Sequence, residues 1–424
     1  MPTLGSANIN SKGVSVAEAW IIDVARTPRG IGKIGKGALA DIHPQRILSS
    51  VLRALAERNS LDTRDIDDVI AGCGTQFGKQ GACIARMAAL DAGYSNDAVG
   101  FSLDRFCGSG LTAVSLGAMG VMSGVQHLVV AGGVESMSHG STLGMGAFID
   151  SGNLALRKLI PQPHQGICGD LIATLEGFSR ADVDGLALES QRRADAAIQG
   201  GYFDRSIIPV IADDGHVALD HDEFPRPQTT FEGLAQLRPA FAAMYEHELD
   251  EQGTTYAKLV RQAYPDIAID HVHTAGNSSG VVDGAGAVVI ASPDYARAHG
   301  LKPRARIRAM ATAGDCPTLM LNGPVPATRK ALAQAGMSLG DIDLFEVNEA
   351  FAVVPLKFMR DLDVDPAKVN VNGGSIALGH PIGATGAIIL GTLLDEMERR
   401  DASVGLATLC AAGGMAPAVI IERI

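Results

Sequence analysis

Amphipathic stretches with the spacing of a helix alternate along the chain with short apolar runs. Ala-rich segments at 43–58, 111–123, 328–335 and 384–399 gather their apolar residues on one face and predict helices. The runs between them are typical of buried strands. This alternation predicts an α/β fold made of layers of helices and mixed sheets.

The pattern occurs twice. Ala-Leu-Ala begins at Ala54 and at Ala331, and Asp-Ile-Asp begins at Asp65 and at Asp341, so the offsets are 277 and 276 residues. In each copy these landmarks fall on a helix, a turn and then a strand. A nearly constant offset predicts two structurally similar halves that pack as a pair.

The halves differ after a third pair of landmarks, the glycine pairs that end at Gly133 and Gly414. Gly414 leads almost at once into an apolar strand, whereas the matching strand after Gly133 begins only at 287. The intervening residues are polar, rich in Pro and Gly, and hold a helical pattern at 182–198. They predict an inserted domain of the kind that carries substrate contacts over a rigid scaffold.

The predicted organisation therefore has three parts. They are an N-terminal half (1–139 and 276–298), an inserted loop domain (140–275) and a C-terminal half (299–424). The 424 residues are 46% hydrophobic and 19% charged, which excludes a disordered chain. The net charge of -12 excludes nucleic acid as the main partner, because no overall positive field neutralises phosphates.

Cysteine usage and the chain ends indicate a reduced, cytoplasmic protein. The six cysteines form no close Cys-x-x-Cys pair. Residues 1–20 lack the pattern of a secretory signal or a transit peptide. Residues 404–421 carry no charge, but glycines and Pro417 divide them, so two buried strands are expected rather than a membrane span. No metal-ligand spacing or nucleotide-binding loop was found, so neither a metal nor a cofactor is expected.

Cys107 is the first candidate for chemistry. The segment 104–110 predicts a strand end, a tight turn and the start of a helix. At a helix N-terminus the free N–H groups and the dipole are expected to lower the pKa of a thiol. A lone cysteine is more often a buried core residue. The glycines on either side of Ser109 favour a nucleophile here, since they let a substrate approach the backbone.

His380 lies in a glycine-dense turn, 372–386, just before a helix. A loop histidine held in this way is a good general base, and a capping or turn histidine is the alternative. His380 follows Cys107 by 273 residues, which is close to the repeat offset. The pseudo-symmetry therefore predicts that both side chains reach one cleft, as a nucleophile and its base must.

Two further residues are candidates. Cys410 lies where a strand runs into a glycine turn, and a second thiol there can exchange protons. Taken alone, it is better explained as a small core residue. Asn348 follows an apolar strand and precedes a helix, so it is predicted to be an N-cap by default. Its functional alternative is an amide that orients a water or an oxyanion.

These segments closely resemble the thiolase family, which comprises acetyl-CoA acetyltransferases and 3-ketoacyl-CoA thiolases. The matching stretches span nearly the whole chain in family order: 24–28, 107–110, 132–137, 274–280, 348–351, 379–381 and the Cys410 turn. The resemblance implies a thiolase-like layered fold, with two pseudo-symmetric βα halves, mixed five-stranded sheets and an inserted loop domain. It also implies a homodimer or homotetramer that uses acyl-CoA and CoA as substrates.

The resemblance further implies a ping-pong acyl transfer. Cys107, deprotonated by His380, attacks an acyl-CoA or 3-ketoacyl-CoA, and Cys410 moves the α-proton of the second substrate. One oxyanion hole would use His380 and a water held by Asn348. The other would use the backbone N–H groups of Cys107 and Ala412.

For CoA binding, Arg226 resembles the nucleotide-contacting arginine of the family, and Ser279 resembles the serine that meets the pantetheine arm. Three features depart from the family. Ala412 replaces the usual glycine, about thirty extra residues lie between 241 and 274, and 166–170 differs from the common helix start. These departures suggest an atypical subgroup, one that could work with a beta-oxidation partner subunit.

Two other interpretations are open. A ketoacyl synthase or related condensing enzyme shares the fold but pairs its cysteine with two histidines, whereas this chain has Asn348 and Cys410. The retained reactive residues argue against a non-catalytic CoA-binding or scaffold member, although Ala412 is compatible with one. An acyl adduct on Cys107 distinguishes an enzyme from a scaffold.

Overall fold

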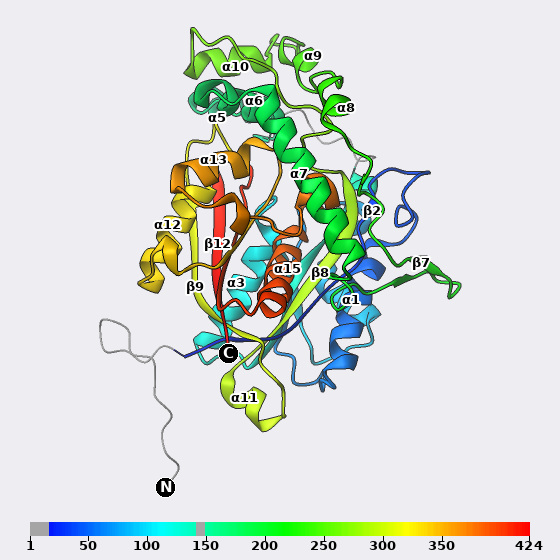
Figure 1. Cartoon of the computed structure of the whole chain (residues 1–424). Coiled ribbons are helices and arrows are strands. Elements are labelled where there is room, and N and C mark those ends of the chain that lie inside the picture. Colours follow the sequence, from blue (N-terminus) through cyan, green and yellow to red (C-terminus); the bar gives the residue numbers. More distant parts are fainter. Residues whose placement is uncertain (1–16, 141–148) are drawn as a thin grey trace.

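The computed structural model describes residues 17–140 and 149–424 (Figure 1). The first half contains five central strands in the spatial order β1 (Trp20–Arg26), β8 (Val282–Ala291), β5 (Leu128–Ser136), β3 (Asp68–Gly72) and β4 (Gly100–Leu103). β8 runs antiparallel to β1 and β5, whereas β3 runs parallel to β5 and β4. The short β2 (Gly30–Ile31) also pairs with β8. The sheet is therefore mixed, as expected.

The second half repeats this order with β9 (Ala305–Gly314), β12 (Met415–Arg423), β11 (Val404–Thr408) and β10 (Leu344–Val347). The strand directions also match those of β1, β8, β5 and β3. At the place of the fifth strand, Val369 forms a single parallel bridge with Phe345. The pseudo-symmetry is thus confirmed, but the second sheet has four full strands among the described residues and not the expected five.

The two sheets meet where β1 pairs with β9 at Trp20 and Ile21, so that one hydrogen-bonded path runs from β10 to β4. Two central helices, α3 (Ser109–Met122) and α15 (Thr385–Arg400), lie side by side and contact strands of both halves (Figure 1). Both helices are largely buried, which explains why apolar and small residues occupy most of their positions and not one face alone. The outer faces are covered by α1 (Pro44–Arg58) and α2 (Ile84–Asp91) on one half, and by α12 (Pro324–Ala335) and α13 (Val353–Leu362) on the other.

The segment between β5 and β8 holds most of the remaining elements. They are α4 (Met137–Gly140), α5 (Leu154–Leu159), α6 (Gln165–Glu176), α7 (Arg180–Gln199), β6 (Val210–Ile211), β7 (Val217–Leu219), α8 (Phe231–Ala235), α9 (Ala242–Tyr245) and α10 (Tyr256–Ala263). In Figure 1, α5, α6, α9 and α10 gather at one end of the molecule. The extra residues after 241 bury Tyr245, Tyr256 and Val260 against Ile167 and Leu171 of α6.

Five short helices complete the fold: α11 (Pro293–Ala298), α14 (Ser375–Leu378) and the 3₁₀ turns η1 (Gly78–Gln80), η2 (Leu339–Asp341) and η3 (Pro366–Lys368). The uncharged stretch 404–421 forms β11 and the antiparallel β12, as predicted. Within the described ranges, no helix is both long and apolar enough to cross a membrane. The expectation that residues 1–20 carry no leader concerns positions that lie mostly outside the described residues.

Candidate active site

Cys107 lies in a strained turn between β4 and α3. Phe106, the residue before it, has a φ of +49°, which is uncommon for a bulky side chain. Asp104 Oδ1 accepts the Phe106 N–H at 2.6 Å, and Ser109 Oγ accepts the Arg105 N–H at 2.8 Å. These bonds hold the turn in its unfavourable conformation, a feature that clusters at functional sites. They place Cys107 two residues before the first residue of α3.

The environment of Cys107 corrects one expectation. Its side chain is buried, and burial raises the pKa of the thiol to about 12, with the charges of Glu135 and Asp104 adding to the effect. The prediction that the pKa of this thiol is lowered is therefore wrong, because burial and the charges of Glu135 and Asp104 raise it. At rest Cys107 is a neutral thiol.

His380 is held in a defined orientation. Its Nδ1 lies 2.6 Å from Thr385 Oγ1, and Thr385 Oγ1 donates its own proton to the Pro381 carbonyl at 2.9 Å. The Thr385 oxygen must therefore accept from Nδ1–H, which assigns the lone pair to Nε2. Burial and the positive charge of Arg29 lower the pKa of His380 to about 3. His380 is thus a neutral base with Nε2 available for a proton.

Asn348 lies beside this base. Its Nδ2 is 3.4 Å from His380 Nε2, and its Oδ1 accepts the Ser375 hydroxyl at 2.6 Å. The following helix, α13, begins only at Val353 and has Ala352 as its N-cap. The N-cap interpretation of Asn348 is therefore wrong, and the amide faces the base.

Two of these partners were not predicted from the sequence. Thr385 fixes the tautomer of His380, and Ser375 fixes the amide of Asn348. Both lie within the glycine-dense turn that drew attention to His380. The available signal was the presence of the polar residues Ser375 and Thr385 in a turn made largely of glycine and apolar residues.

Cys410 lies near enough to Cys107 for the charge of one to act on the other. It follows β11 and is 1% exposed, and burial raises the pKa of its thiol, with the charge of a Cys107 thiolate adding to the effect. The next turn has its positive φ angles at Gly413 and Gly414, both +77°. Ala412 is outside the left-handed region, so an alanine in place of the family's usual glycine creates no backbone strain.

Glycines at the starts of the central helices bring the two loops together. A Cβ at Gly110 of α3 would lie 2.8 Å from the carbonyl oxygen of Gly383, and one at Gly386 of α15 would lie 2.6 Å from Leu111 Cβ. Both distances are too short for a real side chain. The two helices therefore approach so closely only because glycine stands at the contacts. The turn of Cys107 and the loop of His380 are carried by these helix ends.

A groove of about 940 Å³ leads to the same loop. Arg226 and Ser279 both line it, and the Arg226 guanidinium is exposed and lies 5.4 Å over the Phe224 ring. The backbone N–H of His380 donates to the Gly280 carbonyl at 2.8 Å. The groove thus runs from an exposed cation to the backbone that holds His380.

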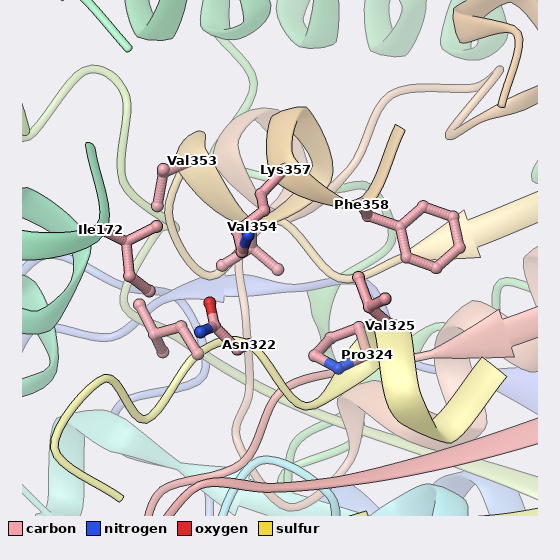
Figure 2. Close-up of a pocket in the computed structure, with 9 residues that line it drawn as sticks. Ile172, Asn322, Pro324, Val325, Val353, Val354, Lys357 and Phe358 are labelled. Atoms are coloured by element: carbon pink, nitrogen blue, oxygen red, sulfur yellow. The ribbon is translucent and has the colours of Figure 1, made fainter. Parts of the chain in front are cut away.

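A second cavity, between α12 and α13, is much smaller. Figure 2 shows Asn322 and Lys357 among the mainly apolar side chains that surround it. Its volume is about 10 Å³, which is room for roughly one water. None of the predicted site residues lines it, so it adds nothing to the candidate active site.

Comparison with known proteins agrees with this geometry. The model of the thiolase N-terminal domain matches residues 19–257, and that of the thiolase C-terminal domain matches 301–423. The acetyl-CoA acetyltransferase of Escherichia coli (strain K12) is 42% identical over 95% of this chain and 98% of its own. A steroid 3-ketoacyl-CoA thiolase of Mycobacterium tuberculosis is 40% identical over 98% of this chain and 96% of its own.

Two further relatives extend the comparison. The beta-ketoadipyl-CoA thiolase of Pseudomonas knackmussii is 38% identical over 96% of this chain and 99% of its own. Among solved structures, the Bacillus anthracis acetyl-CoA acetyltransferase superposes with a TM-score of 0.81 at 35% identity, covering 96% of this chain and 99% of that one.

Proposed function

The chain belongs to the thiolase family of acyltransferases, and from that premise we propose a reversible acyl transfer through an S-acyl cysteine at Cys107. In one direction a 3-ketoacyl-CoA is cleaved by CoA. In the other, an acyl-CoA and acetyl-CoA condense. The observation that carries the proposal is the neutral His380, whose unprotonated Nε2 faces Asn348 beside the glycine contacts that bring in the Cys107 turn.

The first half-reaction begins from a neutral pair. His380 Nε2 takes the proton of the Cys107 thiol as the sulfur attacks the thioester carbonyl, and the imidazolium then returns that proton to the departing CoA sulfur. Because free Cys107 and His380 resist ionisation, the charges develop only when a substrate is present to use them. A water held by the Asn348 amide, together with His380, would stabilise the first oxyanion.

The second half-reaction is assigned to Cys410. We propose that Cys410, a neutral thiol at rest, gives its proton to His380 Nε2 once acetyl-CoA is bound, and that its thiolate then removes the α-proton of this acetyl-CoA. The resulting carbanion attacks the acyl group on Cys107, and the departing Cys107 thiolate takes the proton back from the His380 imidazolium. The backbone N–H groups of Cys107 and Ala412 are the proposed donors to the second oxyanion. Support comes from the position of Cys410 near Cys107, whose charge acts on the Cys410 thiol.

The groove lined by Arg226 and Ser279 is the proposed CoA site. The exposed guanidinium suits an anionic nucleotide end, and Ser279 lies next to Gly280, whose carbonyl accepts the N–H of His380. Lys33 also lines the groove and adds a second cation. This local basic character is what an anionic ligand needs on a chain with a net charge of -12.

The acyl group stays open within the class of 3-ketoacyl-CoA substrates. The relatives named above differ in the acyl group that their names give, from acetyl to ketoadipyl and steroid. The segment after 241 packs on α6, within the inserted part of the chain. A series of 3-ketoacyl-CoA substrates of increasing length is the measurement that ranks them, and it also tests a role in beta-oxidation.

Assembly, domain division and location complete the proposal. Among the described residues, strand β4 is one end of the sheet, and exposed apolar side chains lie beside it, which supports a homodimer or a homotetramer. The division into 1–139 with 276–298, 140–275 and 299–424 is supported by the strand order, although parts of it lie outside the described residues. Six free cysteines support a cytoplasmic location. A beta-oxidation partner subunit stays a hypothesis.

Intact-mass analysis tests the central claim. After mixing with acetyl-CoA, the wild-type protein should gain one acetyl group on Cys107, and Cys107→Ala should gain none while still binding CoA. An acetylated Cys107→Ala protein, or an unmodified wild type that binds CoA, contradicts the proposal. In the same assay Arg226→Ala should require more acetyl-CoA for the same extent of acylation.

A further inference from the structure

Glu135 is a buried carboxylate whose place in the motif 132–137 the acyl-transfer steps leave unexplained. It lies near the end of β5, is 1% exposed, and within the described part of the chain forms no ion pair with Arg, Lys or His. Burying a carboxylate without a counter-charge is costly unless hydrogen bonds replace its water. Its partners should therefore indicate why it is there.

Among the described residues, the groups that form hydrogen bonds with Glu135 are all donors, and they come from both halves. Oε2 accepts the N–H of Gly74 and the N–H of Gly383, each at 2.8 Å. Oε1 accepts the N–H of Thr75 at 3.1 Å and Nε2–H of Gln80 at 3.4 Å. Because no acceptor faces either oxygen, the side chain fits as an ionised carboxylate, although burial raises its pKa.

Gly383 connects this carboxylate to the base, because it lies three residues beyond His380 and two before Thr385. A Cβ at Gly383 would lie 2.6 Å from the Val134 carbonyl oxygen and 2.7 Å from Cys73 Cα. The loop is thus wedged against β3 and β5 of the first half, and the Gly383 carbonyl oxygen meets Gly110 at the start of the Cys107 helix. The Glu135–Gly383 bond fastens the loop of the base to the half that carries the nucleophile.

We propose that Glu135 is a positioning residue that sets the placement of His380 relative to Cys107, a role that rests on the proposed acyl transfer. It does so by binding Gly383 and the loop at Gly74 and Thr75 with one side chain. A glutamine cannot replace it, because its amide nitrogen would face donors in either orientation.

The charge of Glu135 has a second effect, on Cys107 itself. It adds to the burial that raises the pKa of this thiol. The other ionisable groups that act on Cys107 or its neighbourhood are Asp104 in its own turn and Cys410 from the second half. Cys73 is the remaining thiol that faces Glu135. Removing the Glu135 charge should therefore make the Cys107 thiolate easier to form even as the base is displaced.

This opposition gives a test that a merely structural role does not pass. Glu135→Gln should lower kcat by about 10- to 100-fold with little change in KM, because a small misplacement of a reacting group has effects of this order. At the same time Cys107 should react with iodoacetamide faster than in the wild type at pH 8, because a charge that raises the pKa of its thiol has been removed. Glu135→Asp keeps the charge but shortens the reach, so kcat should fall while alkylation stays at the wild-type rate.

The matched control is Asp283→Asn. Asp283 is a fully buried carboxylate on β8, next to the partner of Glu135 in the strand register, and it accepts the N–H and hydroxyl of Ser138 at 2.9 and 2.6 Å. Its loss should lower the Tm without changing the alkylation rate of Cys107 or the kcat.

The outcomes separate the two claims. If Glu135→Gln and Asp283→Asn lower the Tm alike, and both keep wild-type kcat and alkylation, Glu135 is structural and the inference is wrong. If Glu135→Gln does not fold, Glu135→Asp decides through its kcat alone, and a wild-type value overturns the inference. If the wild type itself forms no S-acyl adduct, the proposed function fails, whereas the faster alkylation of Glu135→Gln would still support its coupling to Cys107.

Discussion

At the scale of single residues, the site is built from groups that are neutral before a substrate arrives. Because the pKa of the Cys107 thiol is raised and that of the His380 imidazole is lowered, the two form no ion pair at neutral pH. The sequence showed the helix N-terminus at Cys107, which alone favours a thiolate. It did not show that the Cys107 side chain is buried or that the charge of Glu135 acts on it, because both effects come from segments that are distant along the chain.

The pH dependence of alkylation tests this neutral state. With the Cys107 pKa raised to about 12, its thiolate fraction, and hence its rate of reaction with iodoacetamide, should rise about tenfold per pH unit from 7 to 10 without a plateau. Mass mapping of the labelled peptides follows Cys107 and the exposed Cys83 in one sample, and Cys83 reports the reactivity of an accessible thiol. A Cys107 rate that levels off below pH 7 would show a preformed thiolate.

Cys410→Ser separates the half-reactions. Serine is nearly isosteric with cysteine but ionises far less readily, so it is a poor base near neutral pH. The variant should still acylate Cys107 on mixing with acetyl-CoA, whereas condensation and thiolysis should fall by about 10²–10⁴-fold. Intact mass reports the first step, and steady-state turnover reports the second. A folded variant that does not acylate would assign Cys410 to the first half-reaction, and wild-type turnover would leave it a core thiol.

At the scale of elements, the repeat was visible in the sequence because each half needs the same helix, turn and strand. The predicted helices at 43–58 and 384–399 correspond closely to α1 and α15, and the divided stretch 404–421 became β11 and β12. The sequence did not show that the fifth strand of the second half is missing. The apolar Val369 stands where that strand was expected, but it forms only one bridge, to Phe345. For Asn348 the local pattern favoured an N-cap, because a polar residue after a strand resembles one, whereas the family resemblance implied an amide that holds a water at the oxyanion.

The contact between α3 and α15 gives a prediction at this scale. Gly386→Ala introduces a Cβ against the backbone of Leu111, so the helices must separate. We expect a loss of about 1–3 kcal/mol in the free energy of unfolding, as for other overpacked sites, and a lower kcat because α15 carries the loop of His380. Urea unfolding and steady-state kinetics measure the two effects.

The control for this substitution is Gly185→Ala in α7. No atom lies within 4 Å of a Cβ built there, so the change should add about 0.5–1 kcal/mol of stability through helix propensity and leave kcat unchanged. Equal unfolding curves for the two variants would mean that the close approach of α3 and α15 is not what positions the site.

At the scale of the whole molecule, we infer a contact between copies of the chain from one edge of the sheet. Strand β4 ends the strand order, so among the described residues it pairs only with β3. Val99 and Phe101 are 53% and 39% exposed beside this edge, and Met119 on α3 is 49% exposed. Natural proteins rarely leave an apolar strand edge open to water, because it recruits another chain. The sequence could not show which strand lies at the edge, since strand order is set by tertiary packing.

The assembly prediction follows from that edge. Phe101→Lys places a charge on β4, which a second copy pairing there would have to bury, so the variant should elute as single chains of 44.0 kDa whereas the wild type elutes at twice that mass or more. Light scattering coupled to size-exclusion chromatography measures both. Leu159→Lys on α5, a side chain that is 76% exposed and belongs to the inserted segment, is the matched control and should keep the wild-type mass. If Phe101→Lys keeps that mass and Leu159→Lys loses it, copies associate through the inserted segment and not through β4.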